Sequence, residues 1–239
     1  MTPYASGERW TLYQGDALEW LAGLPSDHAD ICVADPPYSI NTKSDGEGKL
    51  SPWADYCNSA LWYSAWIRDV RRVLRAHGAL WSCLNWRSQV PFQKAACDVR
   101  WAIESMLVWD KKWIGPGGNS GLRPSYEQVA LWLRERGRVH DRGLPDIQPF
   151  PWSSQKPNGH PAEKPEALMV WLIAAVTREP NRLVIDPFCG SGTVGAAALS
   201  SGHRFAGCEL DEAWCEVIAR RLAQAEGDGV QVGMFGAAS

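Results

Sequence analysis

The sequence has no apolar run long enough to span a membrane, and its first ten residues lack the apolar core of a signal peptide. A membrane-spanning helix needs about 20 mostly apolar residues in a row. The sequence also has no C-x-x-C pair, and its seven cysteines are scattered, mostly through apolar surroundings. These absences predict a cytoplasmic protein with reduced thiols, no membrane partner and no zinc site.

A large excess of charge of one sign is also lacking, since the formal net charge is only −3. The distribution of charge is uneven. Residues 68–100 carry seven basic and two acidic side chains, residues 111–142 carry seven and three, and residues 205–228 carry two and six. A basic middle and an acidic end suit a protein that binds a polyanion on one side, although solvated helix faces would give the same pattern.

What is present is an alternation of strand-like and helix-like segments over 239 residues, a length that suits one α/β domain covering residues 1–239. Apolar runs predict seven strands, at 10–16, 29–35, 78–84, 103–110, 128–133, 183–186 and 204–210. Helical periodicity predicts helices at 17–24, 59–75, 89–99, 163–177, 193–200 and 211–225. The proline-rich segment 136–159 is expected to be an irregular excursion, and residues 227–239 a flexible tail.

One apolar run, Ala29 to Ala34, ends abruptly in Asp35-Pro36-Pro37-Tyr38. Two prolines fix the backbone and remove two N–H donors, so the chain leaves the strand rigidly and keeps its carbonyls as acceptors. The Asp35 carboxylate, the Pro36 carbonyl and the Tyr38 ring would together fit an amino group carried on a flat heterocycle. A turn with a surface tyrosine would explain the same residues. The polar, glycine-rich segment 39–52 follows directly, and such loops often close over substrates.

A second motif, Asp186-Pro187-Phe188-Cys189-Gly190-Ser191-Gly192-Thr193, lies between a predicted strand and a predicted helix. Glycines at such a turn let a ligand approach the backbone and the helix N-terminus. Glu209 ends the next predicted strand, at the spacing of an acidic residue that accepts hydrogen bonds from ribose hydroxyls. An ordinary tight βα turn with a capping glutamate is the alternative.

The order of these segments constrains the sheet. A doubly wound sheet needs a strand beyond the one that ends at Glu209, and the N-terminal region must supply it. If residues 10–15 fill this place, Asp16 lies beside the base of the ligand and Asp35 emerges next to Asp186. Both motifs then meet at one edge of the sheet, which is the usual place for a ligand.

In this order, Gly15-Asp16, Asp35 to Tyr38, His160-Pro161 with Lys164-Pro165, Asp186 to Thr193 and Glu209 resemble the motifs of the permuted, β-class DNA amino-methyltransferases. The resemblance covers nearly the whole chain. It implies a Rossmann-like, doubly wound sheet of seven strands with one antiparallel strand, in a circularly permuted methyltransferase fold. It also implies methylation of adenine N6 or cytosine N4 with S-adenosylmethionine, which becomes S-adenosylhomocysteine, and no metal.

The same resemblance implies roles for particular residues. The catalytic residues would be Asp35, Pro36, Pro37 and Tyr38. The residues around the cofactor would be Asp16, Asp35, His160, Lys164, Asp186, Phe188, Cys189, Gly190, Ser191, Gly192, Thr193, Glu209 and Leu210. Among these, Glu209 would hold the ribose, Asp16 the adenine amino group, and Phe188 with two glycines the methionine part. Helix capping or surface charge is the alternative, and Ala162-Glu163 departs from the Thr-Gln that is commoner in relatives.

The motifs together predict a mechanism. Asp35 and the Pro36 carbonyl would each accept one N–H of the target amine and direct its lone pair at the methyl group. The target would be adenine N6 of a base flipped out of double-stranded DNA and stacked on Tyr38, with basic side chains on the phosphates. By the resemblance, aspartate at position 35 favours adenine, since family members that act on cytosine N4 more often carry serine there. The same motifs would also be compatible with methylation of RNA or protein, or with a non-catalytic binding module.

We also expect a homodimer, because a recognition excursion of about twenty residues contacts few base pairs. The fourteen tryptophans exceed what one core of this size needs, and the segment 61–66 is expected to present some of them on an outer face. The alternative is that all of them are core. By the resemblance, the protein would be a bacterial, phage or prophage enzyme of the restriction–modification type. It would lie in the cytoplasm and associate with the nucleoid by binding DNA.

Overall fold

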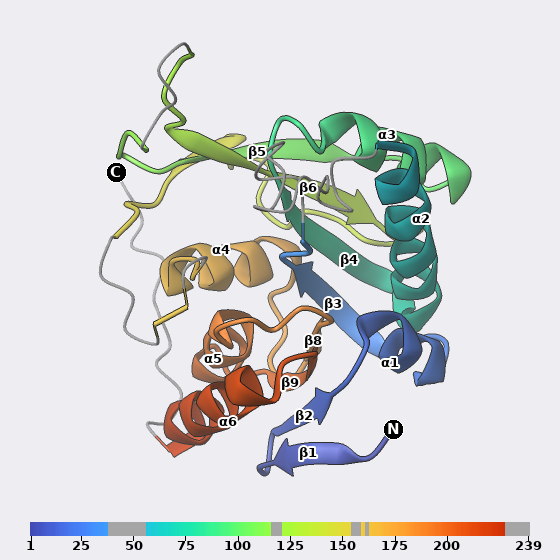
Figure 1. Cartoon of the computed structure of the whole chain (residues 1–239), viewed down its shortest axis with the longest axis vertical. Helices are drawn as coiled ribbons and strands as arrows, with labels where there is room; N and C mark the ends of the chain where they lie inside the picture. The colour runs from blue at the N-terminus through green and yellow to red at the C-terminus, as the bar shows by residue number, and fades with distance from the viewer. Residues whose placement is uncertain (38–55, 116–120, 154–158, 161–162, 228–239) are drawn as a thin grey trace, which may run out of the picture.

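The computed structural model describes residues 1–37, 56–115, 121–153, 159–160 and 163–227, and within them the chain forms a nine-stranded sheet (Figure 1). The strand order is β1-β2-β9-β8-β3-β4-β6-β5-β7. The strands are β1 Pro3–Ser6, β2 Trp10–Gln14, β3 Ala29–Ala34, β4 Leu74–Leu84, β5 Ser105–Asp110, β6 Tyr126–Leu133, β7 Ile147–Pro149, β8 Leu183–Asp186 and β9 Arg204–Glu209.

Helices cover both faces of this sheet (Figure 1). On one face lie α1 Ala17–Gly23, α2 Tyr56–Val73 and α3 Gln89–Asp98, and on the other lie α4 Glu166–Val176, α5 Thr193–Ser200 and α6 Glu212–Gly227. In the part of the chain that the structure describes, no helix is both long and apolar enough to cross a membrane. The predicted α/β, doubly wound architecture is confirmed.

The central strands are apolar on both sides because helices cover both faces. All six residues of β3 are buried, and they alternate between the two cores: Ile31 packs on the side of α4 to α6, and Cys32 packs on the side of α1 to α3. Buried parallel strands read as continuous apolar runs for this reason. Close packing also explains the small residues of α5, since a Cβ on Gly195 would lie 2.4 Å from Leu222 Cδ2.

The predicted number of seven strands is wrong, since the sheet has nine. The two additional strands are short edge strands: β1 pairs antiparallel with β2, and β7 pairs with β5 inside the segment predicted to be irregular. In the interior of the sheet, β6 runs antiparallel to both β4 and β5. In addition, β4 begins at Leu74, inside the predicted helix 59–75, because Leu74 pairs with Ala29 of β3.

The N-terminal strand β2 takes the place that the topology requires. It pairs in parallel with β9, with Gln14 opposite Glu209, and β8 pairs in parallel with β3. The two strands that carry the motifs are therefore neighbours, as predicted. Because β2, β9, β8, β3 and β4 all run in one direction, they end together at one edge of the sheet, which we call the carboxyl edge.

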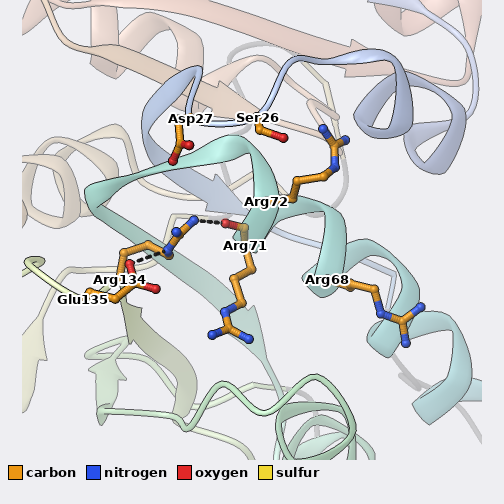
Figure 2. A pocket seen from close by; sticks show the side chains of 7 residues that line it. All are labelled: Ser26, Asp27, Arg68, Arg71, Arg72, Arg134 and Glu135. Atoms are coloured by element: carbon orange, nitrogen blue, oxygen red, sulfur yellow. Dashed lines mark hydrogen bonds and ion pairs between the residues drawn. The ribbon is translucent and has the colours of Figure 1, made fainter.

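The opposite edge, where β3 and β4 begin, holds a cavity of about 340 Å³ that four arginines help to line (Figure 2). Two of these arginines cap helices. Arg72 donates to the Leu21 carbonyl at the end of α1, and Arg134 donates to the carbonyls of Arg71 and Leu74 at the end of α2. Such contacts satisfy carbonyls that a helix end leaves without a partner. These two guanidinium groups therefore serve the scaffold, far along the strands from the carboxyl edge.

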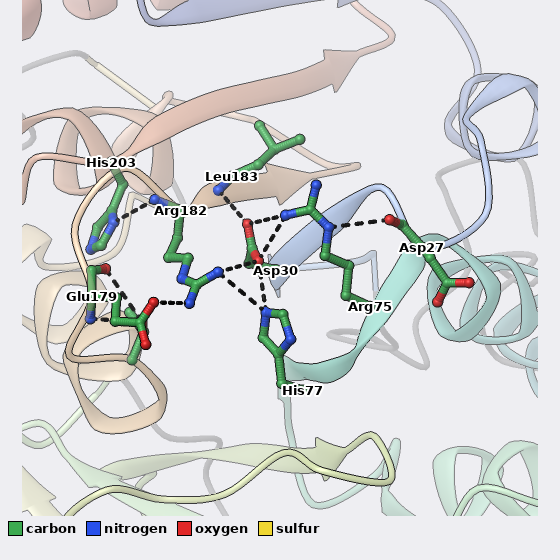
Figure 3. A network of polar contacts seen from close by, with 9 residues as sticks. Asp27, Asp30, Arg75, His77, Glu179, Arg182, Leu183 and His203 are labelled. Carbon is green, nitrogen blue, oxygen red and sulfur yellow. Dashed lines mark hydrogen bonds and ion pairs between the residues drawn. The ribbon is translucent and has the colours of Figure 1, made fainter.

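At the same edge, the buried carboxylate of Asp30 joins three strands (Figure 3). It accepts from Arg75 at 3.0 Å and from the Leu183 N–H at 2.8 Å, and it lies 2.9 Å from His77 Nε2 and 3.3 Å from Arg182. Burial raises the pKa of Asp30, but its donors outweigh burial and hold that pKa below the usual value. This cluster fixes β3, β4 and β8 to one another, and so sets where they end.

Candidate active site

Four carboxylates gather at the carboxyl edge, each at the end of a different strand. Asp16 follows β2, Glu209 ends β9, Asp186 ends β8, and Asp35 follows β3. These four strands are parallel and consecutive in the sheet. The topology thus brings both sequence motifs to one edge, where a doubly wound sheet binds its ligands.

The two oxygens of the Asp35 carboxylate have different surroundings. Oδ2 lies 2.5 Å from Nζ of Lys164, a buried lysine just ahead of α4. Oδ1 is buried as well, but it has no hydrogen-bond partner among the described residues. Leaving a buried acceptor without a partner costs roughly 1–3 kcal/mol. Oδ1 is therefore an acceptor that an incoming N–H would satisfy.

Opposing charges act on Asp35. Burial raises the pKa of its carboxyl, Lys164 opposes that rise, and Glu127 on β6 adds to it. Glu127 Oε2 lies 3.6 Å from Lys164 Nζ, so this lysine bridges two carboxylates. Sequence reasoning missed Glu127. A charged residue in an alternating strand reads as solvent-facing, and the pattern does not reveal which partner it meets.

The backbone after Asp35 is held by α2. The Tyr63 hydroxyl donates to the Pro37 carbonyl at 3.2 Å. Burial raises the pKa of Tyr63 to about 12, so this hydroxyl keeps the proton that it donates. Tyr38 and the segment 39–52, which sequence reasoning assigned to base stacking and to closure over the substrate, lie outside the described residues.

The turn after β8 contains two glycines in left-handed conformations. Gly190 has φ +52° and Gly192 has φ +76°, which L side chains rarely adopt. The Gly192 N–H donates to the Cys189 carbonyl at 2.7 Å and closes the turn tightly. Above Gly190, the His160 ring would lie 3.4 Å from an added Cβ. Glycine therefore permits the left-handed backbone here and lets the His160 ring lie close over the turn.

Glu209 braces the same turn from β9. Its Oε2 accepts the Gly190 N–H at 2.8 Å, and its Oε1 accepts the N–H groups of Leu210 and Asp211 at 2.9 and 3.0 Å. These bonds fix the carboxylate between the glycine turn and the start of α6. Its contact with ribose hydroxyls stays a prediction.

The electrostatics of this edge favour a positively charged ligand. Burial raises the pKa of Asp186 well above its usual value, and the charges of Asp35 and Glu209 raise it further, against a hydrogen bond of 2.9 Å from the Phe188 N–H. Neighbouring carboxylates of this kind disfavour one another's charged forms, and a cation placed among them relieves the repulsion. Within the described ranges, no group of three or more His, Cys, Asp or Glu residues could hold a metal ion.

Aromatic rings flank the glycine turn. Phe188 packs against Trp62 and Trp66 of α2, with ring centroids 5.5 Å apart in each pair. His160 packs edge-to-face on Trp214 of α6 at 4.5 Å. Burial lowers the pKa of His160, so its ring is mostly neutral at neutral pH. Both His160 and Phe188 thus lie at the turn, where the sequence placed them, and Trp214 is an additional neighbour that sequence reasoning missed.

The expectation that the segment 61–66 presents tryptophans on an outer face is wrong for Trp66. This side chain is fully buried, and it packs edge-on against both Phe92 and Phe188. Trp62 is half-buried on the same ring. Leu61, which is 64% exposed, is the large apolar side chain that faces outward in this segment.

The remaining side chains of the turn bond within the protein. Ser191 Oγ and Thr193 Oγ1 lie 2.8 Å apart, and Cys189 Sγ donates to the Asp186 carbonyl. Arg221 of α6 donates to the Ser191 carbonyl at 3.1 Å and to the Thr193 hydroxyl at 3.0 Å. These side chains hold the shape of the turn, and a ligand would meet the turn chiefly through its backbone.

Asp16 and Leu210 are both exposed at this edge. Asp16 is the N-cap of α1, and its Oδ1 accepts the N–H groups of Leu18 and Glu19 at 2.8 and 3.1 Å. Asp16 therefore caps a helix, which was the alternative to contact with a cofactor. The cap occupies one of its two carboxylate oxygens. Leu210 is 70% exposed beside Glu209, a large apolar surface that a bound ring would cover. For both residues, contact with a cofactor stays a prediction.

Aromatic and basic side chains that are exposed or half-buried continue the carboxyl edge beyond Asp35. After β4, the Arg87 guanidinium lies 4.6 Å from the ring centroid of Trp86, which is 59% exposed. After β5 and β7, the rings of Trp113 and Trp152 stack with centroids 4.0 Å apart. Aromatic faces and arginines together suit contact with nucleic acid bases and phosphates.

A doubly wound sheet with a glycine turn after one strand and an acidic residue at the end of the next is typical of Rossmann-like folds that bind a nucleotide-like ligand. A family model described as DNA methylase (N6_N4_Mtase) matches residues 29–220. The chain belongs to this DNA methylase family.

Individual relatives agree with the family. The DNA adenine methyltransferase YhdJ of Escherichia coli (strain K12) is 28% identical over 249 residues, covering 90% of this chain and 83% of YhdJ. The protein YubD of the same strain is 30% identical over 210 residues, covering 88% of each chain. The type II methyltransferase M.HinfI of Haemophilus influenzae is 24% identical and covers 90% of this chain.

Solved structures share the fold. The PvuII DNA methyltransferase, described as cytosine-N4-specific, matches with a TM-score of 0.73 and 16% identity, covering 94% of both chains. TTHA0409 of Thermus thermophilus, complexed with S-adenosyl-L-methionine, matches with a TM-score of 0.65 and 21% identity, covering 90% of this chain and 95% of the other. At these identities the likeness is one of fold.

Proposed function

We propose that this protein transfers a methyl group from S-adenosylmethionine to the N6 amino group of adenine in double-stranded DNA, with Asp35 as the catalytic residue. The observation that carries the proposal is the Asp35 carboxylate, in which Lys164 holds Oδ2 while Oδ1 is buried without a partner among the described residues. Family membership and the glycine turn on the neighbouring strand support the same reaction.

The residues at the carboxyl edge fit such a cofactor. When bound, S-adenosylmethionine supplies a methyl group on a positively charged sulfur. Asp186, Asp35 and Glu209 crowd three carboxyl groups at this edge, where burial and neighbouring charge raise the pKa of Asp186, and a cationic ligand would relieve that crowding. The backbone at Gly190 and the ring of Phe188 would line the methionine part, and Glu209 would hold the ribose.

Asp35 would act on the target amine. An exocyclic amine is a weak nucleophile because its lone pair is delocalised into the ring. When Asp35 Oδ1 and the Pro36 carbonyl each accept one N–H, the nitrogen becomes more tetrahedral and its lone pair is released. The nitrogen gains a methyl group and loses one proton, and Oδ1 is already hydrogen-bonded to that nitrogen. Burial raises the pKa of Asp35, which helps it to receive the proton.

Two observations favour adenine as the target base. Position 35 holds aspartate, whereas the family resemblance associates serine at this position with action on cytosine N4. The relative YhdJ, at 28% identity, is described as a DNA adenine methyltransferase. Cytosine N4 is the alternative, and the neighbour described as cytosine-N4-specific shares the fold at only 16% identity.

DNA would approach the carboxyl edge. The target base has to leave the duplex, because a paired base keeps its amine inside the helix. We assign Trp86 and Arg87 to DNA contact at this edge, Tyr38 to stacking on the flipped base, and the segment 136–159 to recognition. Phosphate contacts by the whole basic stretch 68–142 are not proposed, because Arg72 and Arg134 cap helices at the opposite edge.

A homodimer stays a prediction that rests on the short recognition segment. The tryptophan argument for it is weakened, because Trp66 is core and Trp62 is half-buried. Light scattering at micromolar concentration, with and without DNA, tests it. A mass near 26.5 kDa, that of one chain, in both conditions would rule the dimer out.

Transfer of tritium from labelled cofactor tests the proposed reaction. The purified protein would be offered double-stranded DNA, RNA and protein in separate reactions, with Asp35→Ala as the control. We expect label in DNA with the wild-type protein and none with Asp35→Ala. Label that enters RNA or protein but not DNA would overturn the proposal.

A further inference from the structure

A row of four charged side chains leads away from the Asp35 site along the carboxyl edge. Lys164 Nζ lies 2.5 Å from Asp35 Oδ2 and 3.6 Å from Glu127 Oε2, and Glu127 Oε1 lies 2.5 Å from Lys111 Nζ. The signs alternate from Asp35 to Lys111. The four residues come from the end of β3, the segment before α4, the start of β6 and the residue after β5.

These charges are largely withdrawn from water. The side chains of Lys164, Glu127 and Lys111 are 8%, 18% and 12% exposed. Ion pairs that are shielded in this way are fixed in position, unlike pairs on an exposed surface, which contribute little. Lys111 also lies 5.2 Å from the ring centroid of Trp109, a buried side chain of β5. The far end of the row is thus anchored in the sheet.

We propose that Lys164 and Glu127 are positioning residues for the catalytic carboxylate: Lys164 holds Oδ2 so that Oδ1 faces the target amine, and Glu127, anchored by Lys111, holds Lys164. This inference rests on the proposed role of Asp35 in methyl transfer. Its physical basis is that a carboxylate held by one oxygen cannot rotate freely, so the other oxygen stays in one place. Fixed acceptors and donors of this kind lower barriers because they need no rearrangement during the reaction.

The row also sets how easily Asp35 is protonated. The charged and titratable groups that face it are Lys164 and His160 ahead of α4, Glu127 on β6, Asp186 on β8 and Cys83 on β4. Burial raises the pKa of Asp35, Lys164 lowers it, and Glu127 raises it. The acid limb of the activity profile marks the pH below which Asp35 is protonated and cannot accept the N–H. Loss of Lys164 therefore moves that limb to higher pH, and loss of the Glu127 charge moves it to lower pH.

The test compares Lys164→Met and Glu127→Gln with a matched control, Glu104→Gln, which removes the same charge from an exposed residue ahead of β5. The measurements are kcat and KM for DNA across pH, and the Kd of the cofactor. We expect kcat of Lys164→Met to fall about a hundredfold at neutral pH, a larger factor than any change in the Kd of the cofactor. Lys164→Arg should regain part of the loss. Glu127→Gln should lose less, since glutamine still accepts a hydrogen bond.

The opposite displacement of the two acid limbs is the result that a purely structural role would not produce. The inference would be overturned if the acid limbs of Lys164→Met and Glu127→Gln coincide with that of the wild type, or if both move in the same direction. This holds even if DNA methylation itself is observed. If Lys164→Met does not fold, Lys111→Met carries the test. It leaves the Glu127 charge less compensated, so its limb should move to higher pH. Absence of methyl transfer in the wild-type protein would instead overturn the proposed function.

Discussion

Arg221 of α6 and Glu163, just ahead of α4, form an ion pair of 2.9 Å across the glycine turn. The same guanidinium donates to the Ser191 carbonyl and the Thr193 hydroxyl, and it pairs with Glu166 at 2.9 Å. Glu163 is the second residue of Ala162-Glu163, which the family resemblance marked as a departure from Thr-Gln. The structure supplies a reason for the glutamate, because the buried Glu163 carboxylate pairs with Arg221, which also holds the turn.

We predict that Arg221→Ala destabilises the fold by about 3 kcal/mol, because it leaves Glu163 buried without its cation. Urea denaturation measures this change. The matched control is Arg220→Ala, which removes an exposed arginine from the same helix. Adding Glu163→Gln to Arg221→Ala should restore part of the stability. A double variant no more stable than Arg221→Ala would show that the pair is not the cause.

Gly190→Ala should weaken cofactor binding about tenfold, or 1.4 kcal/mol. The added Cβ would stand 3.4 Å from the His160 ring, on the side of the turn where we propose that the cofactor binds. Gly159→Ala is the matched control, since Gly159 has φ +77° with nothing within 4 Å of its Cβ position. Both variants bear similar backbone strain. Calorimetric titration should therefore show weaker cofactor binding for Gly190→Ala than for Gly159→Ala. Equal cofactor affinities of the two variants would remove Gly190 from the binding site.

Asp30→Asn should cost about 2 kcal/mol of stability at neutral pH, because Arg75 and Arg182 lose their buried anion. The pKa of Asp30 is held below its usual value in the folded protein. Its contribution is therefore complete above the unfolded pKa of about 4 and is lost as pH falls through the folded pKa.

Denaturation at a series of pH values tests this sign. The stability gap between wild type and Asp30→Asn should be constant near neutral pH and should narrow below about pH 4. Asp69→Asn, which removes a half-exposed partner of Arg72, should change stability by less than about 1 kcal/mol. If the stability difference between wild type and Asp30→Asn widened in acid, the lowered pKa assigned to Asp30 would be contradicted.

DNA binding should weaken steeply with salt, with a log–log slope of about −0.9 for each phosphate contact. Arg87→Ala should make the slope shallower by about one such contact, because Arg87 lies at the carboxyl edge over Trp86. Arg68→Ala should leave it unchanged, since Arg68 lines the cavity at the opposite edge. Fluorescence anisotropy from low to moderate salt would measure both. A loss of slope in Arg68→Ala would place the DNA on the other side of the protein.

The sequence was sufficient to predict the meeting of the two motifs, because topology leaves few choices. An apolar run that ends in Asp35, a glycine turn after Asp186 and the need for a strand beside Glu209 together require the order that is observed. Short edge strands were missed for a physical reason. β7 has three residues and ends in Pro149, so its pairing with β5 decides its structure, and local propensity does not.

Side-chain partners were harder to predict than strands. Glu127 and Lys111 lie far from Asp35 in sequence, and only the adjacency of β6 to β4 and β5 brings their charges near the site. The prediction that the tryptophan-rich segment of α2 faces outward was wrong for Trp66. The helical spacing of its apolar residues is compatible with either a core face or an outer face. Trp66 packs against Phe92 of α3 and Phe188 of the glycine turn, and these residues, distant in sequence, make it part of the core.

The central claim is that Asp35 directs methyl transfer to the N6 amine of adenine in DNA. Its most direct test is mass spectrometry of nucleosides from DNA incubated with cofactor and either wild-type protein or Asp35→Ala, after calorimetry has shown that both bind the cofactor. We predict N6-methyladenine with the wild-type protein and none with Asp35→Ala. N4-methylcytosine in place of N6-methyladenine, or undiminished N6-methyladenine with Asp35→Ala, would contradict the claim.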